Sequence, residues 1–395
     1  MEMSIPKRHP VFMVMGREAE RIKHNPAYRF LLFLGPLIGI FLLYFIFRQG
    51  VTRDLPIAVV DQDNSSLSIK LRNALEASPD LAVVASPADI FQAREMLESA
   101  QVDAIVLLPS GLENKVYREV EAVVPAYING TNVLTGGIIQ RAVLKTVGTI
   151  SAGIQLKKQL LNEKNEAQAM ARVMPVELRQ HILFNPYGNY NYFLNSAMMN
   201  IMLYLFAFLA SIYTFGNELK RGTGRELLEA SNSSVRLAIV GKMFPYTVIF
   251  TGFAMLINLL LYEFGGMPIN GSFFLILFGQ LITMLTYQLL GVWLVALTYN
   301  LRLSLSIASA YSMMAVTFSG LTFPFEGMPL VARIFAAFFP FTWWEKLFIS
   351  QSLYGGPRSD ALIYICCILI FQLLAFTGFK LYKRRLGDEK YWGKA

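Results

Sequence analysis

The distribution of long apolar runs constrains this chain more than any other feature of its sequence. One run, residues 30–47, lies near the N-terminus, and five more follow a mainly polar stretch, residues 48–192. These five are residues 193–215, 244–264, 273–297, 303–323 and 361–382. Crossing a bilayer as a helix takes roughly 20 apolar residues. The pattern therefore predicts an α-helical membrane protein with six transmembrane helices and a folded domain inserted between the first two.

Composition and charge placement support that class and give the chain an orientation. Hydrophobic residues make up 54% of the chain and charged residues 16%, which is more apolar than a typical soluble domain. The basic residues behind the net charge of +8 gather before the first run, between the second and third, and after the last. Residues 265–272, after the third run, contain no Lys or Arg. The positive-inside rule then predicts an inner (plasma) membrane protein with both termini cytoplasmic and residues 48–192 extracytoplasmic. This placement gives no indication of nucleic-acid binding.

The segments outside the apolar runs have predicted structures of their own. Residues 1–29 mix apolar and basic side chains, which predicts an amphipathic helix lying on anionic headgroups at the cytoplasmic interface. A basic flank that only sets the topology is the alternative. Residues 48–192 alternate strand and helix patterns, which predicts an α/β domain with a largely parallel sheet and a long helical stalk. Residues 193–383 form a five-helix transmembrane half, and residues 384–395 a basic cytoplasmic tail.

Within the α/β domain, the pattern also predicts individual elements. We expect helices at residues 67–77, 88–100 and 131–170, and strands at residues 55–60, 81–85, 104–108 and 122–129. Asp61 and Asp63 follow the first strand, but the Gly and Glu that a calcium loop requires are not at their positions. We therefore interpret this pair as turn and helix-cap residues, and we predict no metal site.

The sequence lacks the residues that several classes of function require. No G-x-x-x-x-G-K-[ST] motif is present, so the chain has no P-loop for ATP. All three histidines lie outside the apolar runs, and no catalytic constellation is apparent. Lys242 and Glu263 lie at the edges of apolar runs, where long side chains can snorkel toward the headgroups. Cys366 and Cys367 are adjacent in the last run, and we interpret them as small packing residues.

Residues 216–234 have the pattern of a short helix between two transmembrane helices. The sequence GNELKRGTGRELLEASNSS is charged, breaks at Gly222 and resumes as a helical stretch over residues 225–230. Thr223 and Glu226 have the spacing of a capping box, in which each side chain satisfies a backbone amide at the start of a helix. The sequence therefore predicts a short helix at the cytoplasmic face.

A short helix in this position would suit the docking of a soluble partner. Leu227 and Leu228 would provide its apolar anchor, and the charged residues around them would provide complementary charge. The predicted coupling residues are Glu218, Arg221, Gly222, Thr223, Arg225, Leu227 and Leu228. An ordinary polar loop is the alternative.

Residues 324–354 interrupt the pattern between the fifth and sixth runs. Pro324, Pro329 and Pro340 break any continuous helix, although the residues between them are strongly apolar. Non-helical backbone at membrane depth must be buried in protein or line a cavity. We therefore expect a re-entrant helical hairpin that dips into the outer leaflet.

This segment also supplies a set of candidate gate residues. Trp343 and Trp344 would mark the membrane interface. Glu345 beside them is costly without a partner, and Lys346 is its nearest candidate. The predicted gate residues are Pro324, Glu326, Met328, Pro329, Pro340, Trp343, Trp344 and Glu345.

These two segments resemble the transmembrane subunits of type-2 ABC exporters. Residues 218–234 resemble the Glu-x-x-Arg-Gly-Thr…Leu-Leu…Ser element that forms the coupling helix of that family. Residues 319–329 (SGLTFPFEGMP) and 339–345 (FPFTWWE) are similar to its signature between the fifth and sixth spans. The inserted domain, opening with AVVDQDNSSLS, is similar to that of the subfamily with a large extracytoplasmic domain. One departure is Gly224, an extra glycine that shifts the expected helix boundaries.

The resemblance implies a transport subunit, and the energy for transport would come from other chains. It implies separate ABC ATPase subunits that bind ATP and Mg²⁺, and a second permease subunit, identical or different, that completes the path. It further implies an amphipathic or hydrophobic exported substrate, a periplasmic adaptor protein as a partner, and contact with membrane lipids. The alternative is a membrane-anchored sensor or assembly protein whose extracytoplasmic domain binds a ligand. The apolar span interiors and the unrepeated arrangement of spans disfavour a secondary carrier.

Overall fold

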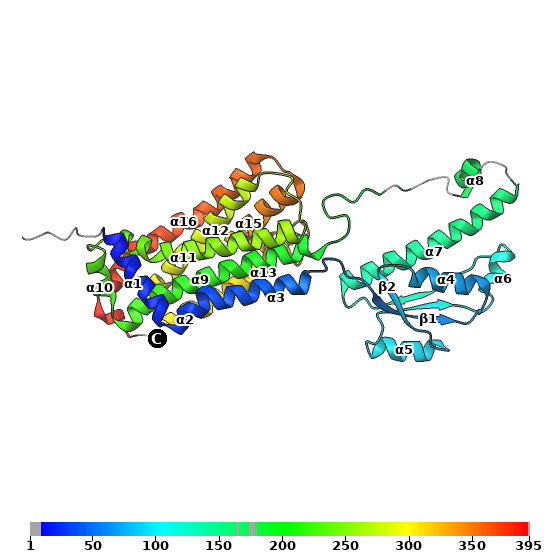
Figure 1. The fold of residues 1–395 in the computed structure, drawn as a ribbon, viewed down its shortest axis with the longest axis horizontal. Coiled ribbons are helices and arrows are strands. Elements are labelled where there is room, and N and C mark those ends of the chain that lie inside the picture. The colour runs from blue at the N-terminus through cyan, green and yellow to red at the C-terminus, as the bar shows by residue number, and fades with distance from the viewer. Residues whose placement is uncertain (1–8, 163–165, 174–177, 179, 394–395) are drawn as a thin grey trace, which may run out of the picture. The chain divides into compact units, whose positions relative to one another are not determined.

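The computed structural model describes residues 9–162, 166–173, 178 and 180–393 (Figure 1). It divides into two compact units, one formed by Met1–Gly50 with Ile182–Ala395 and the other by Val51–His181. The first eight residues of the predicted amphipathic segment lie outside the described residues, as do residues 163–165 of the predicted long helix.

The first unit is a helical bundle. Its elements are α1 (Pro10–His24), α2 (Pro26–Arg29), α3 (Gly35–Phe47), α9 (Ser196–Arg221), α10 (Gly224–Ala230), α11 (Val235–Asn258), α12 (Phe273–Thr298), α13 (Leu301–Phe318), α14 (Leu330–Ala336), α15 (Pro340–Ile349) and α16 (Arg358–Gly387). Four π-helical turns adjoin these helices, at Phe30–Leu34, Asn191–Asn195, Leu259–Phe264 and Ser350–Tyr354, and two 3₁₀ turns lie at Phe325–Gly327 (η4) and Glu389–Tyr391 (η6).

Six helical runs in the described part of the chain are long and apolar enough to cross a membrane. They are Pro26–Phe47, Asn191–Arg221, Val235–Phe264, Phe273–Thr298, Leu301–Phe318 and Arg358–Gly387. The predicted number of spans is thus confirmed, but the fifth span ends at Phe318, not at residue 323. The chain leaves the helix there because Gly320 has a φ of 99°, a conformation that only glycine adopts easily.

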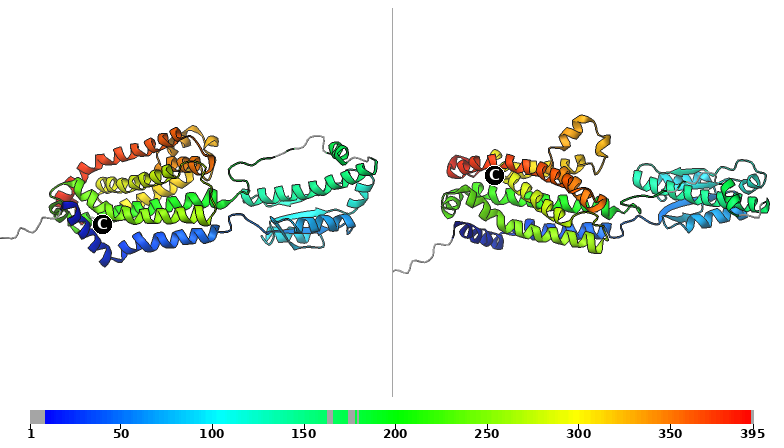
Figure 2. Two further views of the ribbon diagram at one scale, coloured as in Figure 1. Left: turned by 45° about the horizontal axis from the view of Figure 1, so that its top comes forward. Right: turned by 90° about the horizontal axis from the view of Figure 1, so that it is seen from above.

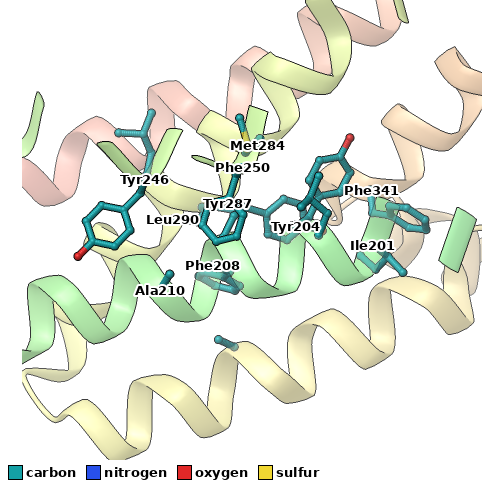
Figure 3. Close-up of a cluster of buried hydrophobic side chains, with 14 of the residues drawn as sticks. Ile201, Tyr204, Phe208, Ala210, Tyr246, Phe250, Met284, Tyr287, Leu290 and Phe341 are labelled. Atoms are coloured by element: carbon teal, nitrogen blue, oxygen red, sulfur yellow. The ribbon is translucent and has the colours of Figure 1, made fainter. Parts of the chain in front are cut away.

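Helix α9 lies at the centre of the bundle, in contact with α3, α11, α12 and α13 (Figures 1 and 2). Figure 3 shows the aromatic side chains that fill this core. The rings of Tyr204 on α9 and Tyr287 on α12 stack with centroids 5.6 Å apart, and Phe208 packs edge-on against Tyr287. Aromatic pairs of this kind stabilise packing beyond their buried area, so they fix α9 against α12.

The bundle core also contains uncharged polar side chains. Asn258 on α11 donates to Gln280 on α12 (2.8 Å), and Gln280 donates to Asn200 on α9 (2.7 Å). All three are buried. Hydrogen bonds between membrane helices satisfy groups that lipid cannot, so this chain of amides ties three helices together.

The second unit contains a four-stranded sheet in the described residues, with strand order β2-β1-β3-β4. Strands β1 (Leu55–Asp61), β2 (Leu81–Ala85) and β3 (Ala104–Leu108) are parallel, and β4 (Ala126–Ile128) is antiparallel to β3. The helices are α4 (Ser66–Glu76), α5 (Ile90–Glu98), α6 (Leu112–Tyr117), α7 (Val133–Asn162) and α8 (Glu166–Val173). Helix α6 was not predicted, and the long helix predicted at 131–170 is described as α7 and α8.

Alternate residues of β1 face two small cores. Ile57 and Val59 pack with Leu71 of α4 and with α7, whereas Val60 packs with Ala93 of α5 on the other face of the sheet. Helices α4 and α7 thus cover one face and α5 the other (Figure 1). This alternation is the period of two that a strand imposes on its side chains.

The turn after β1 confirms the interpretation of its two aspartates. Asp61 accepts from the backbone amides of Asp63 and Asn64, at 3.0 and 2.9 Å. Ser65 caps α4 in a capping box with Ser68. Asp63 accepts from Ser65 Oγ (2.6 Å) and from the backbone amides of Leu112 and Glu113, both at 3.0 Å. Desolvation raises the pKa of Asp63, but these hydrogen bonds outweigh it, so the pKa lies below its usual value.

Candidate functional site

The short helix α10 lies at the end of the bundle where α1 and the C-terminal part of α16 also lie (Figure 1). It contacts α1, α9, α11 and α16. Helix α9 ends because Gly222 adopts a φ of 70°, the left-handed conformation that commonly follows a helix C-terminus. The break predicted at Gly222 is therefore present. The structure assigns no side-chain cap to α10, so the capping box predicted for Thr223 and Glu226 is wrong.

Thr223 has a different role, because it belongs to a buried group of charged side chains beside α10. We call Arg17, Glu18, Arg21, Glu218 and Lys242 the charge cluster. Arg17, Glu18 and Arg21 lie on α1, Glu218 on the last turns of α9, and Lys242 on α11. The cluster therefore joins three helices at the base of α10.

Glu218 is the centre of the charge cluster. Its side chain is 0% exposed, as is that of Lys242, whose Nζ lies 2.7 Å from Glu218 Oε1. Arg17 and Arg21 of α1 both donate to its carboxylate, at 3.2 and 3.1 Å to Oε2. The hydroxyl of Thr223 donates to it as well. Every charged group that contacts this carboxylate is thus opposite in sign, and a buried ion is stable only when it is paired in this way.

Lys242 links this group to a second buried carboxylate. Its Nζ lies 2.6 Å from Glu18 Oε2, and Glu18 also accepts from Tyr246 OH (2.6 Å) and from the Thr214 hydroxyl. The sequence interpretation of Lys242 as a side chain that snorkels to the headgroups is therefore wrong. Glu18, Lys242 and Glu218 are thus ionisable groups inside this bundle, and they neutralise one another.

The cluster changes the interpretation of α1 as well. Val14 and Glu18 of α1 are buried, and α1 packs against α11 so closely that a Cβ on Gly241 would lie 2.8 Å from Val14 Cβ. Arg17 and Arg21 bind protein carboxylates, so they do not bind lipid headgroups as predicted. Partial burial lowers the pKa of Arg21, but the charge and hydrogen bond of Glu218 together with the charge of Glu18 outweigh it, so its pKa lies above the usual value and it stays charged.

Two of the predicted docking residues point inward. Leu227 is 0% exposed and belongs to the bundle core, so it anchors α10 to its own chain. Glu218 is buried in the charge cluster and has no surface to offer a partner. The sequence gives no way to distinguish an apolar residue that packs internally from one that binds another protein.

The remaining predicted residues do reach the surface. Arg221 and Arg225 are exposed, and Leu228 is half-buried. Two acidic residues of α10, Glu226 and Glu229, are also exposed, and Glu226 forms an ion pair with Arg17 at 3.0 Å. The outer side of α10 is thus a charged surface that also contains one partly exposed apolar residue, Leu228.

Residues near the C-terminus hold α10 from its other side. Arg225 forms an ion pair with Glu389 (2.9 Å) and its guanidinium lies 5.6 Å from the ring centroid of Trp392. The amide of Gly393 donates to Leu219 O (3.1 Å). A Cβ on Gly224 would lie 2.6 Å from Leu386 O, so α10 and α16 are in backbone contact there. We call residues 386–393 the C-terminal clamp.

The other predicted site, at residues 324–354, forms two short helices. Pro329 caps α14 and Pro340 occupies its favoured place in the first turn of α15. Pro324 precedes the 3₁₀ turn η4, in which Glu326 is exposed, and Met328 is buried. The prolines therefore separate the elements as predicted.

The tryptophans and Glu345 are placed differently from the prediction. Trp344 is 0% exposed and packs edge-on against Tyr204 inside the bundle, so it does not form an interfacial belt. The Nε1 of Trp343 donates to Ala337 O (3.1 Å). Lys346 lies 3.7 Å from the ring centroid of Phe325, so it does not pair with Glu345.

Glu345 is 3% exposed, and among the described residues neither of its carboxylate oxygens has a hydrogen-bond partner. Unpartnered buried polar atoms also occur nearby, on Tyr204, Tyr287, Thr342 and Trp344. Tyr204 contacts both Tyr287 and Trp344 through its ring. This region of the bundle therefore has polar groups that the single chain leaves unsatisfied.

A comparison with protein families gives this geometry its context. The family model described as ABC-2 family transporter protein matches residues 26–379. This range takes in α10, Lys242, α15 and most of both units. The chain belongs to the ABC-2 family of transporter proteins. It is therefore a multi-pass membrane protein and the permease subunit of an ABC transporter, a type of subunit that is generally not catalytic itself. No curated protein matches the chain.

The ABC-2 match covers only part of the site. The match contains Glu218 and Lys242 but begins after α1, which supplies Arg17, Glu18 and Arg21. It also ends before the C-terminal clamp. The contacts that α1 and the C-terminal clamp make with α10 therefore lie outside the matched range and were found in the structure. The sequence did contain one indication that Glu18 faces the bundle: it follows the apolar Val14 by four residues and so lies on the same face of α1.

Proposed function

We propose that this ABC-2 permease belongs to an ATP-driven exporter, and that a separate ABC ATPase subunit docks on the outer side of α10. ATP and Mg²⁺ would bind on that partner chain. The exposed Arg221, Arg225 and Glu229, with the half-buried Leu228, supply a surface of mixed charge and some apolar area. Electrostatic complementarity of this kind sets the orientation and specificity of a partner.

The observation that carries the proposal is the bonding of Glu218. One buried carboxylate is bound at the same time by α1, by α11 and by Thr223 at the start of α10. Separating Lys242 of α11 from this carboxylate would leave a buried charge without its buried partner of opposite sign, which costs about 3–5 kcal/mol, and losing the Thr223 hydroxyl would remove a hydrogen bond to a charged group. A displacement of α10 by an ATPase would therefore move α9 and α11 with it, and these are two of the candidate spans.

The path for the substrate would lie between this permease and a second one, identical or different. Helix α13 supports this proposal, because its mean hydropathy of 1.2 is the lowest among the six candidate spans. Its exposed residues include Ser306, Ser309 and Thr317 beside Met313. Hydroxyl groups mixed with apolar side chains suit an amphipathic or hydrophobic substrate, or a facing protein helix, better than lipid.

The opposite end of the bundle would form the exit. We propose that α14 and α15 enter the outer leaflet as a re-entrant hairpin, and that Glu345 and its polar neighbours are satisfied by substrate or by the second permease. An unpaired carboxyl in a membrane protein is a functional hypothesis by default. The α/β unit would then be extracytoplasmic, where it would gate the exit or bind a periplasmic adaptor protein. Both termini would be cytoplasmic, in the inner membrane.

The test is co-purification of the tagged permease from its native host in mild detergent, with mass spectrometry of ABC ATPase chains. The variant Arg221→Glu/Arg225→Glu should lose most of the ATPase while its unfolding temperature stays close to that of the wild type. Both arginines are exposed, and a surface ion pair such as Arg225–Glu389 contributes at most about 1 kcal/mol.

The matched control is Arg302→Glu/Arg384→Glu, which makes the same charge change on exposed residues of α13 and α16. It should retain the ATPase. If both double variants retain it equally, α10 is not the docking surface. If no ABC ATPase accompanies even the wild type, the docking proposal fails.

A further inference from the structure

A groove between α11, α12 and α16 is not used by the docking surface. Its volume is about 940 Å³. Its apolar lining comes from all three helices and includes Val240, Phe244, Leu285, Leu289 and Phe376. Val240, Phe244 and Phe376 are about half exposed, so the groove opens to the outside of the bundle along candidate membrane spans. Its surroundings are therefore lipid.

One end of this groove is strongly basic. Arg236 lies in the first turn of α11, and Lys380 and Lys383 lie near the C-terminal end of α16. All three line the groove and are exposed, and no Asp or Glu lines it. In the described part of the chain, none of the three takes part in an ion pair, although the neighbouring charge cluster is fully paired.

The dimensions of the groove match one leaflet of a bilayer. Its α11 side runs from Val235 to Thr247, which is roughly 18 Å of helix at 1.5 Å per residue. The hydrocarbon of one leaflet is half of about 30 Å. A ligand with its anionic group on the three cations would therefore extend its apolar part along the groove within a single leaflet.

We propose that this groove binds one anionic glycerophospholipid. Its phosphate would lie among Arg236, Lys380 and Lys383, and its acyl chains would lie along Val240, Phe244 and Phe376. A basic pocket between membrane helices is the usual setting for such a headgroup. Under the orientation proposed above, the lipid comes from the cytoplasmic leaflet. A zwitterionic lipid fits less well because its ammonium group would face three uncompensated cations.

The position of this lipid links it to the coupling end. Ile239 and Met243 of α11 line the groove, and Lys242 between them belongs to the charge cluster. The bound lipid would bridge α11 and α16, which carries the C-terminal clamp. We therefore expect anionic lipid to stabilise the helices around α10, with or without an ATPase bound.

The test uses the full-length permease, purified in detergent and stripped of lipid, titrated with phosphatidylglycerol or phosphatidylcholine. Bound lipid is counted by native mass spectrometry, and the unfolding temperature is measured in parallel. The triple variant Arg236→Gln/Lys380→Gln/Lys383→Gln should weaken phosphatidylglycerol binding about a hundredfold, because each basic residue contributes a factor of about five. Its binding of phosphatidylcholine should not change.

The matched control, Arg302→Gln/Arg358→Gln/Arg384→Gln, removes three exposed cations that do not line the groove. It should bind phosphatidylglycerol as the wild type does. A second variant, Val240→Trp, fills the groove without changing charge and should also weaken binding. The proposal is overturned if both lipids bind equally, if glycerol phosphate alone competes as well as the lipid, or if both triple variants lose binding to the same extent. No arm depends on an ATPase or on transport, so the outcome is independent of the docking proposal.

Discussion

Glu218 and Glu345 are both buried in the helical bundle, but their surroundings are opposite. Glu218 is bound by two arginines, a lysine and a threonine from its own chain. Glu345 has no partner for either oxygen among the described residues, and the one adjacent cation, Lys346, lies against Phe325. The first carboxylate lies beside α10 and the second on α15.

This difference indicates that a buried carboxylate has one of two roles in this bundle, depending on whether it is paired. A fully paired cluster resists separation, so it suits the transmission of movement between helices. An unpaired group destabilises the chain that carries it, which natural sequences tolerate mainly at functional sites. The comparison thus predicts that mutations at the two carboxylates have opposite effects on stability.

The largest effect is expected from Lys242→Ala. Removing this cation leaves Glu18 and Glu218 buried close to each other, which should lower the free energy of unfolding by about 3–5 kcal/mol. Thermal unfolding in detergent measures the loss, and ATP-driven transport should fall with it. Lys220→Ala, which removes an exposed lysine from the same end of the bundle, should have little effect. Equal stability of the two variants would show that the charge cluster does not hold the helices together.

A smaller decrease in the free energy of unfolding is expected from Gly224→Ala, which tests the contact between α10 and α16. The new methyl group would meet Leu386 O at 2.6 Å and force the two backbones apart, at a cost of about 1–3 kcal/mol. Gly252→Ala on α11 is the control, because nothing lies within 4 Å of its Cβ position. That control should be neutral or slightly stabilising. Co-purification of the ATPase should decline only in the Gly224 variant.

Glu345→Gln should change the free energy of unfolding in the opposite direction: it should leave stability unchanged or raise it by up to about 1 kcal/mol. The amide keeps the shape of the side chain and removes the possibility of a buried charge. Glu218→Gln is the matched comparison and should destabilise the protein. The expectation fails if Glu345→Gln is the more destabilising of the two in the isolated subunit. Reduced transport with unchanged stability would support a role for Glu345 in the path or the gate.

The smallest effect concerns Asp63, a carboxylate in the α/β unit that accepts hydrogen bonds from α6. Because its pKa is lowered in the folded state, its contribution is present above the unfolded pKa of about 4 and is lost as pH falls through the lower folded pKa. Amide exchange in α4 and α6, corrected for the intrinsic effect of pH, should rise in that window. Asp63→Asn should remove this pH dependence, and an unchanged profile would contradict the assignment.

Local patterns predicted much of the fold. Strands β2 and β3 have the predicted bounds, because short apolar runs were bounded by turn residues on both sides. The helix break at Gly222 was also predictable, because glycine readily adopts the left-handed conformation that ends a helix. Such features depend on near neighbours in the chain, and a single sequence contains that information.

The site could be predicted only in part, because its chemistry depends on residues far apart in the chain. Hydropathy placed Lys242 at a span edge but gave no indication of Glu18, which lies 224 residues away in the sequence. Trp344 resembled an interfacial residue until its packing against Tyr204 was known. The position of Leu227 in the sequence predicted an apolar contact, but it did not show whether that contact is with a partner protein or within the chain itself. Long-range pairing decides all three cases.

The C-terminal clamp has a consequence for how the protein is made. The turn between α9 and α10 is held by Arg17 from the beginning of the chain and by Trp392 and Gly393 from its end. This turn therefore acquires all its contacts only after residues 392 and 393 have been synthesised. A chain released before α16 would contain every candidate span through α13 and still lack part of the contacts that hold α10. Under the docking proposal, such incomplete chains would be defective at the surface that binds the ATPase.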